Sequence, residues 1–239
     1  MSTFRDDARQ HLALALDIDD LVAALRIAKP LTEYFAVAKI GLELFTAAGP
    51  ESIVALSSEG YEVFVDLKLH DIPTTVGRAA RVLGALGVSY ATVHTSGGHA
   101  MVEAATAGMA DGAHSAGLPT PSVLGVTVLT SDSEASTDVL TDRARIALES
   151  GCGGVVCAGA DVAVVKNAAP GLLLVVPGIR PAQTALDDQA RVATPAAAIA
   201  AGADLLVIGR AVTASPDPEA TSARIRDEVA AVLGEMSPC

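Results

Sequence analysis

The sequence is poor in positive charge, in charged residues as a whole and in aromatic residues. Of its 239 residues, 16 are Lys or Arg and 28 are Asp or Glu, which gives a formal net charge of −12. Nucleic-acid binding depends on Lys and Arg that neutralise phosphates, so this balance argues against a nucleic-acid partner. An acidic protein that binds an anionic small molecule must concentrate its few cations at the binding site.

Cysteine and long apolar runs are also scarce. The three cysteines are Cys152, Cys157 and Cys239. They are too few for a disulfide framework and share no metal-ligand spacing, so we expect a reducing compartment, the cytoplasm. The N-terminal residues contain no apolar signal core. The longest uncharged stretch, residues 112–131, is interrupted by Pro119 and Pro121, so no membrane span is expected.

What remains is the composition of a well-packed α/β protein, with 51% hydrophobic and 18% charged residues. No linker divides the chain, so we expect one domain over residues 1–239, with 1–10 an N-terminal extension and 235–239 a tail. A unit of about thirty residues recurs, in which an apolar run is followed by a polar turn and a helical stretch. The predicted strands are apolar on both faces, as in a parallel sheet covered by helices. They are residues 12–16, 35–40, 62–67, 90–93, 123–128, 154–157, 172–176 and 205–208.

Glycine and proline mark the predicted helix ends. Glycine adopts the left-handed conformation that ends helices, and six glycines precede predicted strands. They are Gly60, Gly87, Gly117, Gly151, Gly171 and Gly202. Thr194-Pro195 and Ser215-Pro216 each offer a hydroxyl cap before a proline, and Pro73 is expected to begin a third helix in the same way.

Eight such units can close into a barrel or form an open doubly wound sheet. The similar strand lengths, the chain length and the absence of GxGxxG after the first strand favour a (β/α)8 (TIM) barrel.

The polar residues of this barrel gather where the predicted strands end, which is where such barrels carry out their chemistry. They are Asp17, Lys39, Asp66, Lys68, Asp71, His94, Thr130, Ser131, Arg180 and Arg210. Strand alternation points Asp66 and Lys68 to the same inward face, and Lys39 ends the neighbouring strand. Alternating charges of this kind keep lysines protonated and aspartates ionised. Taken alone, the DxKxxD motif fits a structural ion-pair network equally well.

Two further segments indicate phosphate binding. Arg180 and the pair Gly209-Arg210 follow the last two predicted strands, where barrels often hold a phosphate. Gly209 allows close approach of the backbone, and Arg180 can offer a bidentate guanidinium. The polar segment 181–191, which contains Gln189, has the character of a lid over the ligand. Solvated arginines and an ordinary loop are the alternatives.

Two other residues are expected to be structural. His94 has no nearby HxH, HExxH or carboxylate partner in sequence, so we expect a hydrogen-bonded structural histidine and predict no metal site. Cys157 ends a predicted strand without an evident base, which indicates apolar packing rather than a nucleophile.

Several segments closely resemble the orotidine 5′-phosphate decarboxylase family. They are residues 38–45, 66–75, 126–131, 177–181, 188–191 and 207–210, and the resemblance extends from residue 12 to about residue 219. DxKxxD is shared with related sugar-phosphate enzymes, whereas DLKLHDIP together with PGIRP and DQxR is specific. Thr74 stands where many members have Asn, which does not affect the catalytic set.

The resemblance implies decarboxylation of orotidine 5′-phosphate to UMP and CO2, the last step of de novo UMP biosynthesis, without cofactor or metal. Asp17 and Lys39 would bind the ribose hydroxyls. Asp66 would face the substrate carboxylate, and Lys68 would deliver a proton to C6. The phosphate and the pyrimidine would be held by Pro177, Arg180, Gln189, Gly209, Arg210, Thr130 and Ser131.

The resemblance also implies a homodimer with shared active sites, in which Asp71, Ile72 and Thr75 reach the neighbouring subunit's site. Two rival functions stay open at this stage. One is a Mg2+-dependent decarboxylase or lyase of the same barrel type that acts on an open-chain sugar phosphate. The other is a non-catalytic phosphate-binding barrel.

Overall fold

A computed structural model describes residues 7–129, 136–180 and 193–236. Eight parallel strands close into a barrel in sequence order, from β1 to β8, and β8 pairs with β1. The strands are β1 Leu12–Leu16, β2 Val37–Ile40, β3 Glu62–Leu69, β4 Tyr90–His94, β5 Ser122–Val126, β6 Gly154–Val156, β7 Leu173–Val176 and β8 Leu205–Ile208. The prediction of a (β/α)8 barrel is therefore confirmed. The predicted strand bounds differ most at β5, which runs from Ser122 to Val126, and by two residues at the start of β2 and at the end of β3, which continues to Leu69.

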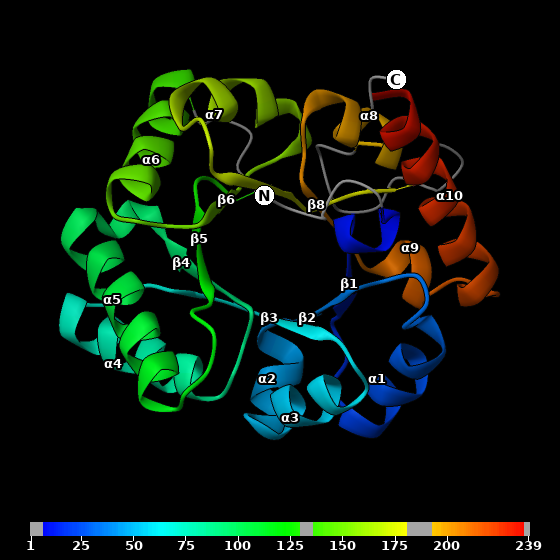
Figure 1. The fold of residues 1–239 in the computed structure, drawn as a ribbon, viewed down its shortest axis with the longest axis horizontal. Coiled ribbons are helices and arrows are strands. Elements are labelled where there is room, and N and C mark those ends of the chain that lie inside the picture. The colour runs from blue at the N-terminus through cyan, green and yellow to red at the C-terminus, as the bar shows by residue number, and fades with distance from the viewer. Residues whose placement is uncertain (1–6, 130–135, 181–192, 237–239) are drawn as a thin grey trace.

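Helices surround the barrel in a ring (Figure 1). The α-helices are α1 Leu21–Ala28, α2 Leu42–Ala48, α3 Glu51–Ser58, α4 Pro73–Ala85, α5 His99–Ser115, α6 Thr137–Glu149, α7 Val162–Ala168, α8 Pro195–Ala201, α9 Arg210–Thr213 and α10 Pro218–Met236. Short 3-10 helices are η2 Ala8–His11, η3 Lys29–Leu31, η4 Thr95–Gly97 and η5 Gly159–Asp161. None of the helices in the described ranges is long and apolar enough to cross a membrane.

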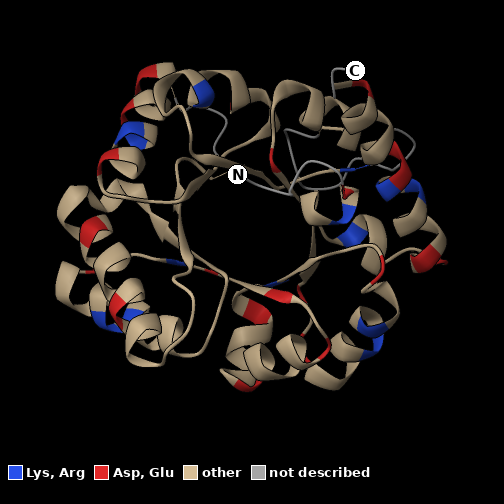
Figure 2. Ribbon diagram, viewed as in Figure 1, with Lys and Arg blue, Asp and Glu red and all other residues tan. Residues whose placement is uncertain are grey.

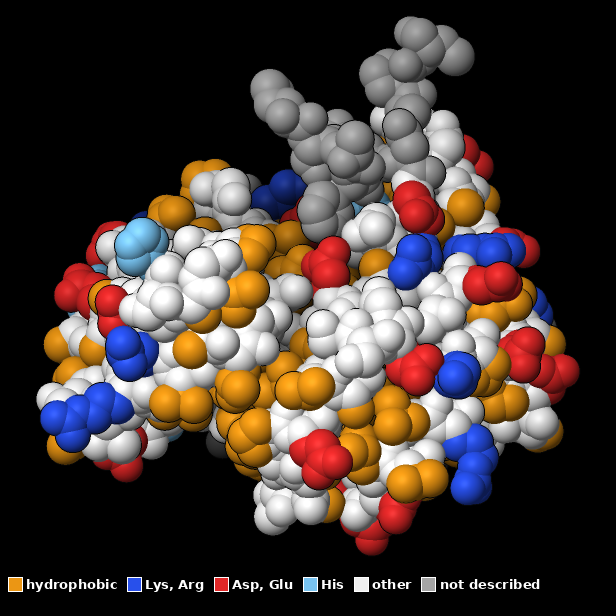
Figure 3. Space-filling model, turned by 60° about the horizontal axis from the view of Figure 1, so that its bottom comes forward, with side chains coloured by type: hydrophobic (Ala, Val, Ile, Leu, Met, Phe, Trp, Pro, Cys, Tyr) orange, Lys and Arg blue, Asp and Glu red, His pale blue; other side chains and the backbone are white. Residues whose placement is uncertain are grey.

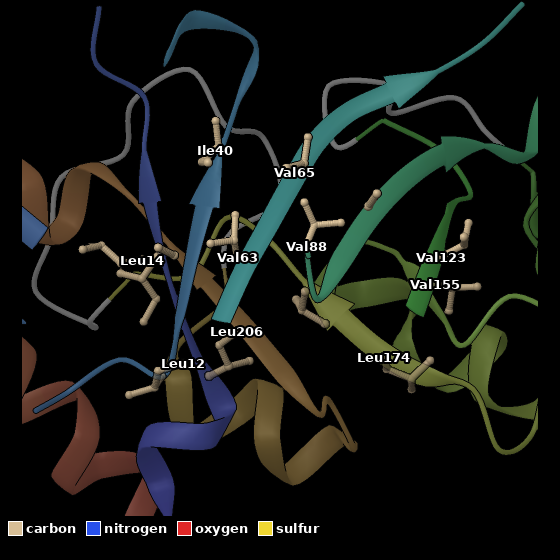
Figure 4. Close-up of a cluster of buried hydrophobic side chains, with 14 of the residues drawn as sticks. Leu12, Leu14, Ile40, Val63, Val65, Val88, Val123, Val155, Leu174 and Leu206 are labelled. Carbon is tan, nitrogen blue, oxygen red and sulfur yellow. The ribbon is translucent and has the colours of Figure 1, made fainter. Parts of the chain in front are cut away.

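Alternation along the strands produces two separate apolar layers. In β1, Leu12, Leu14 and Leu16 belong to the larger cluster, which lies between the strands and the helices, as Figure 4 shows for part of it. Ala13 and Ala15 belong to a second cluster, together with residues such as Phe64 and Tyr90, whose rings meet edge to face. This second cluster fills the barrel interior, because successive side chains of a strand point to opposite faces.

The glycine prediction is confirmed. All six predicted glycines have positive φ angles, between 69° for Gly117 and 104° for Gly202. Two predicted helix starts are also confirmed: α4 begins at Pro73, and Thr194 caps α8 by accepting the Ala197 N–H.

The third predicted helix start is wrong. The last helix begins at Pro218, two residues after Pro216, and the Asp217 carboxylate accepts the Ala220 N–H at 2.9 Å. Ser215 instead accepts the Asp217 N–H at 3.2 Å. Ser215-Pro216 and Asp217-Pro218 both place a polar capping residue before a proline, so this pattern alone does not show which of them begins the helix.

The amino-terminal end of the barrel is closed by η2. This helix contacts β1, β8 and α10, and Ala8 is buried. The His11 imidazole is 2.8 Å from the Asp204 carbonyl oxygen, and the Ala36 N–H donates to the Arg9 carbonyl. Residues 8–10, expected as part of an extension, therefore pack against the barrel.

Charged residues lie mainly on the helices of the outer ring (Figure 2). Acidic, basic and hydrophobic side chains are interspersed on the face shown in Figure 3. The exception is the end of the barrel formed by the carboxyl ends of the strands, where charged residues line a cavity.

Candidate active site

A cavity of about 460 Å³ opens at the carboxyl ends of the strands. This volume lies within the range of small-molecule sites. Eight of the predicted site residues line it, namely Asp17, Lys39, Asp66, Lys68, Pro177, Arg180, Gly209 and Arg210. Side chains from the barrel interior, including Ala15, Phe64 and Val207, give the same cavity an apolar floor. The cavity therefore combines an apolar surface with charged groups at defined positions.

Four charged side chains form a continuous chain along one wall. The Lys39 ammonium is 3.0 Å from Asp17 Oδ1 and 3.7 Å from Asp66 Oδ2. The Lys68 ammonium is 2.9 Å from each of the two Asp66 oxygens. Only 8% of the Lys39 side chain is exposed, and the two flanking carboxylates are the partners of its buried ammonium group.

Lys68 lies in an irregular part of β3. The register between β3 and β4 changes from Val65–Ala91 to Leu69–Val93, so three residues of β3 oppose the single residue Thr92. Lys68 has a φ angle of 50°, in the left-handed region that non-glycine residues rarely adopt. Asp66 and Lys68 both line the cavity, as strand alternation predicts, but Lys68 reaches it from a bulge rather than from a regular strand.

Gly41 leaves the space that this array requires. A Cβ atom at this position would lie 2.5 Å from Asp17 Oδ1 and 3.1 Å from the Lys39 ammonium nitrogen. Its φ angle of −86° is accessible to any residue, so the requirement for glycine is steric. The sequence analysis did not identify Gly41, because the contact depends on two side chains from different strands.

The cavity is also lined by two arginines, which follow the last two strands. Arg180 is 6% exposed, and its backbone N–H donates to the Ala193 carbonyl at 3.0 Å. The preceding Gly178 has a φ angle of 76°. Gly209 and Arg210 approach from the end of β8, where α9 begins at Arg210. Two arginines thus line the same cavity as the two lysines and two aspartates of the array.

Three predicted residues lie outside this cavity. Asp71, Ile72 and Thr75 surround the start of α4, and all three are exposed, Ile72 by 67%. The Asp71 carboxylate accepts the Ile72 N–H at 2.6 Å. Within this chain, the structure therefore does not bring Asp71 into contact with the lysine–aspartate array.

Three other predicted residues, Thr130, Ser131 and Gln189, lie outside the described residues, as does the predicted lid at 181–191.

His94 and Cys157 have environments in keeping with structural roles. The Ser96 hydroxyl is 2.8 Å from His94 Nδ1. Burial lowers the pKa of His94 most strongly, and the nearby charges of Arg143, His70 and Lys68 lower it further. Cys157 is 1% exposed, and burial raises the pKa of its thiol to about 12, which disfavours the nucleophilic thiolate.

Two residues beside the site were missed by the sequence analysis. Arg143 of α6 donates to the Thr127 carbonyl at 2.6 Å, just beyond the end of β5. Thr92 of β4 contacts both Asp66 and Lys68. An arginine in a polar helix and a threonine in an apolar strand are both ordinary in sequence, so neither gave a signal.

The fold and the cavity define a class of (β/α)8-barrel protein that receives an anionic ligand at the carboxyl ends of its strands. Comparison with known proteins assigns the chain within that class. It belongs to the Orotidine 5′-phosphate decarboxylase / HUMPS family, whose model matches residues 10–225.

Relatives and solved structures agree with this assignment. The chain is 43% identical over 237 residues to an orotidine 5′-phosphate decarboxylase of Moorella thermoacetica, with 94% of each sequence covered. It is 45% identical over 218 residues to the Dichelobacter nodosus protein of the same name, covering 87% of this chain and 93% of that one. The crystal structure of orotidine 5′-phosphate decarboxylase from Lactobacillus acidophilus matches with a TM-score of 0.79 and 34% identity, covering 92% of this chain and 99% of that one.

Proposed function

We propose that this protein is a carboxy-lyase that converts orotidine 5′-phosphate to UMP and CO2. The observation that carries the proposal is the position of the Lys68 ammonium, which lines the cavity 2.9 Å from both oxygens of Asp66. The two arginines that line the same cavity, Arg180 and Arg210, fit a phosphate. The names of the relatives support the same reaction.

The reaction needs a cation beside the carbon that loses CO2. When the bond between C6 and the carboxylate breaks, its electron pair stays on C6, in the plane of the ring where the π system cannot delocalise it. A fixed ammonium stabilises this charge electrostatically and then transfers a proton to C6. Lys68 takes this role, and the neutral amine regains its proton from water. Asp66 lies beside the leaving carboxylate and orients Lys68.

The remaining wall residues hold the substrate. Asp17 and Lys39 bind the ribose hydroxyls, and Lys39 also pairs with Asp66. Arg180, Gly209 and Arg210 bind the phosphate, and Pro177 lines the cavity next to them. Binding energy from the phosphate, which is remote from C6, helps to order the array around the reacting carbon. The family resemblance assigns pyrimidine binding to Thr130 and Ser131 and phosphate binding to Gln189.

The working form is a homodimer with shared sites, formed through the start of α4. Ile72 is an exposed hydrophobic residue next to Asp71, and Thr75 is exposed on the following turn. Apolar surface of this kind is stabilised by burial against a second subunit. In the dimer, Asp71 extends the charged array of the partner's site. The enzyme works in the cytoplasm, and the buried free thiols of Cys152 and Cys157 suit a reducing compartment.

A direct assay tests the reaction. Purified protein is mixed with orotidine 5′-phosphate, and the loss of substrate absorbance is followed with and without EDTA. We expect conversion to UMP at the same rate in both samples. No conversion would overturn the proposal, and loss of activity in EDTA would favour the metal-dependent rival.

Mixing two inactive variants tests the shared site. A hybrid of a Lys68→Ala subunit and an Asp71→Ala subunit has both defects in one site and neither defect in the other. After subunit exchange at equal concentrations, we expect recovery of about a quarter of the wild-type activity, since half of the dimers are hybrids with one intact site. If Asp71 acts within its own subunit, no activity returns.

A further inference from the structure

Thr92 of β4 connects two charged residues of the active site through one hydroxyl group. Its Oγ1 accepts the backbone N–H of Lys68 at 2.8 Å and donates to Asp66 Oδ1 at 2.9 Å. These directions are fixed, because an amide can only donate and an ionised carboxylate can only accept. The side chain is 1% exposed, so the two bonds are shielded from water.

The strand irregularity explains why a side chain is needed at this point. Asp66, Leu67 and Lys68 together oppose only Thr92, so the backbone of β4 cannot pair with each of them. A buried N–H without a partner is costly, and the Thr92 hydroxyl supplies the acceptor for Lys68. The same contact offsets the unfavourable left-handed φ of 50° at Lys68.

We infer that Thr92 is a positioning residue for the decarboxylation, and this inference rests on the proposed function. It holds the Lys68 backbone and the Asp66 carboxylate in one arrangement, so that the ammonium stays 2.9 Å from both Asp66 oxygens. Thr92 is not one of the described residues that line the cavity. It therefore acts through Asp66 and Lys68 rather than by touching the substrate.

The test replaces Thr92 with valine, which keeps the shape of the side chain and removes the hydroxyl. Misplacement of a catalytic group by about 1 Å can cost about 100-fold in rate, so we expect kcat to fall by between about 10- and 100-fold. Thr92→Ser keeps the hydroxyl and should restore most of kcat. The affinity for UMP should change less than about threefold, because the phosphate and ribose contacts are untouched.

Thr95→Val is the matched control. Thr95 is 0% exposed, follows the end of β4, and donates one hydrogen bond to the Val126 carbonyl at 2.8 Å. Its loss should lower stability to a similar extent while kcat stays close to wild type. If Thr92→Val does not fold, the pair Thr92→Ser and Thr92→Ala makes the same comparison with smaller side chains.

The inference is overturned if Thr92→Val keeps the wild-type kcat, if Thr92→Ser loses as much as Thr92→Val, or if Thr95→Val shows the same fall in kcat. A wild-type enzyme that does not decarboxylate orotidine 5′-phosphate would instead overturn the proposed function. A crystal structure of Thr92→Val tests the positioning role of Thr92 independently of the reaction that the enzyme catalyses. We expect Lys68 to leave the left-handed region and its ammonium to move away from Asp66, and an unchanged Lys68 would contradict the positioning role.

Discussion

The mouth of the barrel and the layer between strands and helices are held together by different forces. At the mouth, Lys39 and Lys68 are held by carboxylates at distances of 2.9–3.7 Å. In the layer, side chains such as Leu56 are fully buried among other apolar groups. Burial of apolar surface is the main stabilising force in folding, whereas a buried ion pair is weak evidence for stability. We therefore expect the mouth to determine activity and the layer to determine stability.

The largest expected effect separates the two regions most clearly. Lys68→Ala removes the proton donor and the cation beside C6, and we expect kcat to fall by a factor of roughly 10²–10⁴ or more. UMP binding and the unfolding temperature should remain close to wild type. Lys29→Ala is the control, since the Lys29 side chain is 74% exposed and its ion pair is with Glu59, away from the cavity. Near-normal turnover by Lys68→Ala would remove Lys68 from the mechanism.

The next effect concerns the layer. Leu56 lies on the inner face of α3 and is 0% exposed, so Leu56→Ala should lower the free energy of unfolding by about 2–5 kcal/mol. The folded fraction should keep its kcat, measured below the unfolding transition. Val54 is on the same helix but 59% exposed, and Val54→Ala should have a much smaller effect. Thermal unfolding measures the stability of both variants. Equal destabilisation by Leu56→Ala and Val54→Ala would contradict the claim that the buried layer determines stability.

Gly41→Ala tests how tightly the mouth is built. The added Cβ would contact Asp17 Oδ1 and the Lys39 ammonium, so the array must shift by a few tenths of an ångström or more. We expect kcat/KM to fall by about 10- to 100-fold with little loss of stability. Gly234→Ala is the control, because nothing lies within 4 Å of the position that its Cβ would occupy. Wild-type kinetics for Gly41→Ala would show that the array is looser than the distances indicate.

The smallest effect concerns the barrel interior at alkaline pH. Burial, followed by the neighbouring Glu62, raises the pKa of Tyr90 from 10.0 to about 12. The unfolded chain therefore loses this proton first, and the contribution of Tyr90 to stability is complete below pH 10 and is lost between pH 10 and about 12. Tyr90→Phe should reduce the decline in stability over this range by up to ~1.4 kcal/mol per pH unit, with pH 8 as the reference. An identical decline in both proteins would contradict the burial effect.

The barrel could be predicted from the sequence because its signals are local. Short apolar runs and glycines such as Gly87 and Gly202 mark where strands begin and helices end. The charged residues at the strand ends were identified in the same way, since a barrel brings those ends together. The prediction that Asp66 and Lys39 lie close together required only the alternation of side chains along a strand and the pairing of neighbouring strands.

What could not be predicted depends on contacts between distant residues. The left-handed backbone of Lys68 follows from the change of register between β3 and β4, which no local pattern encodes. The roles of Thr92 and Gly41 likewise become visible only when their neighbours from other strands are in place. The start of α10 was misplaced because Ser215-Pro216 and Asp217-Pro218 carry the same local signal.

A crystal structure of the enzyme with UMP bound tests the central claim most directly. The account predicts C6 of the pyrimidine facing the Lys68 ammonium, the ribose hydroxyls beside Asp17 and Lys39, and the phosphate between Arg180 and Gly209-Arg210. A nucleotide bound in the reverse orientation, or with C6 out of reach of Lys68, would contradict it.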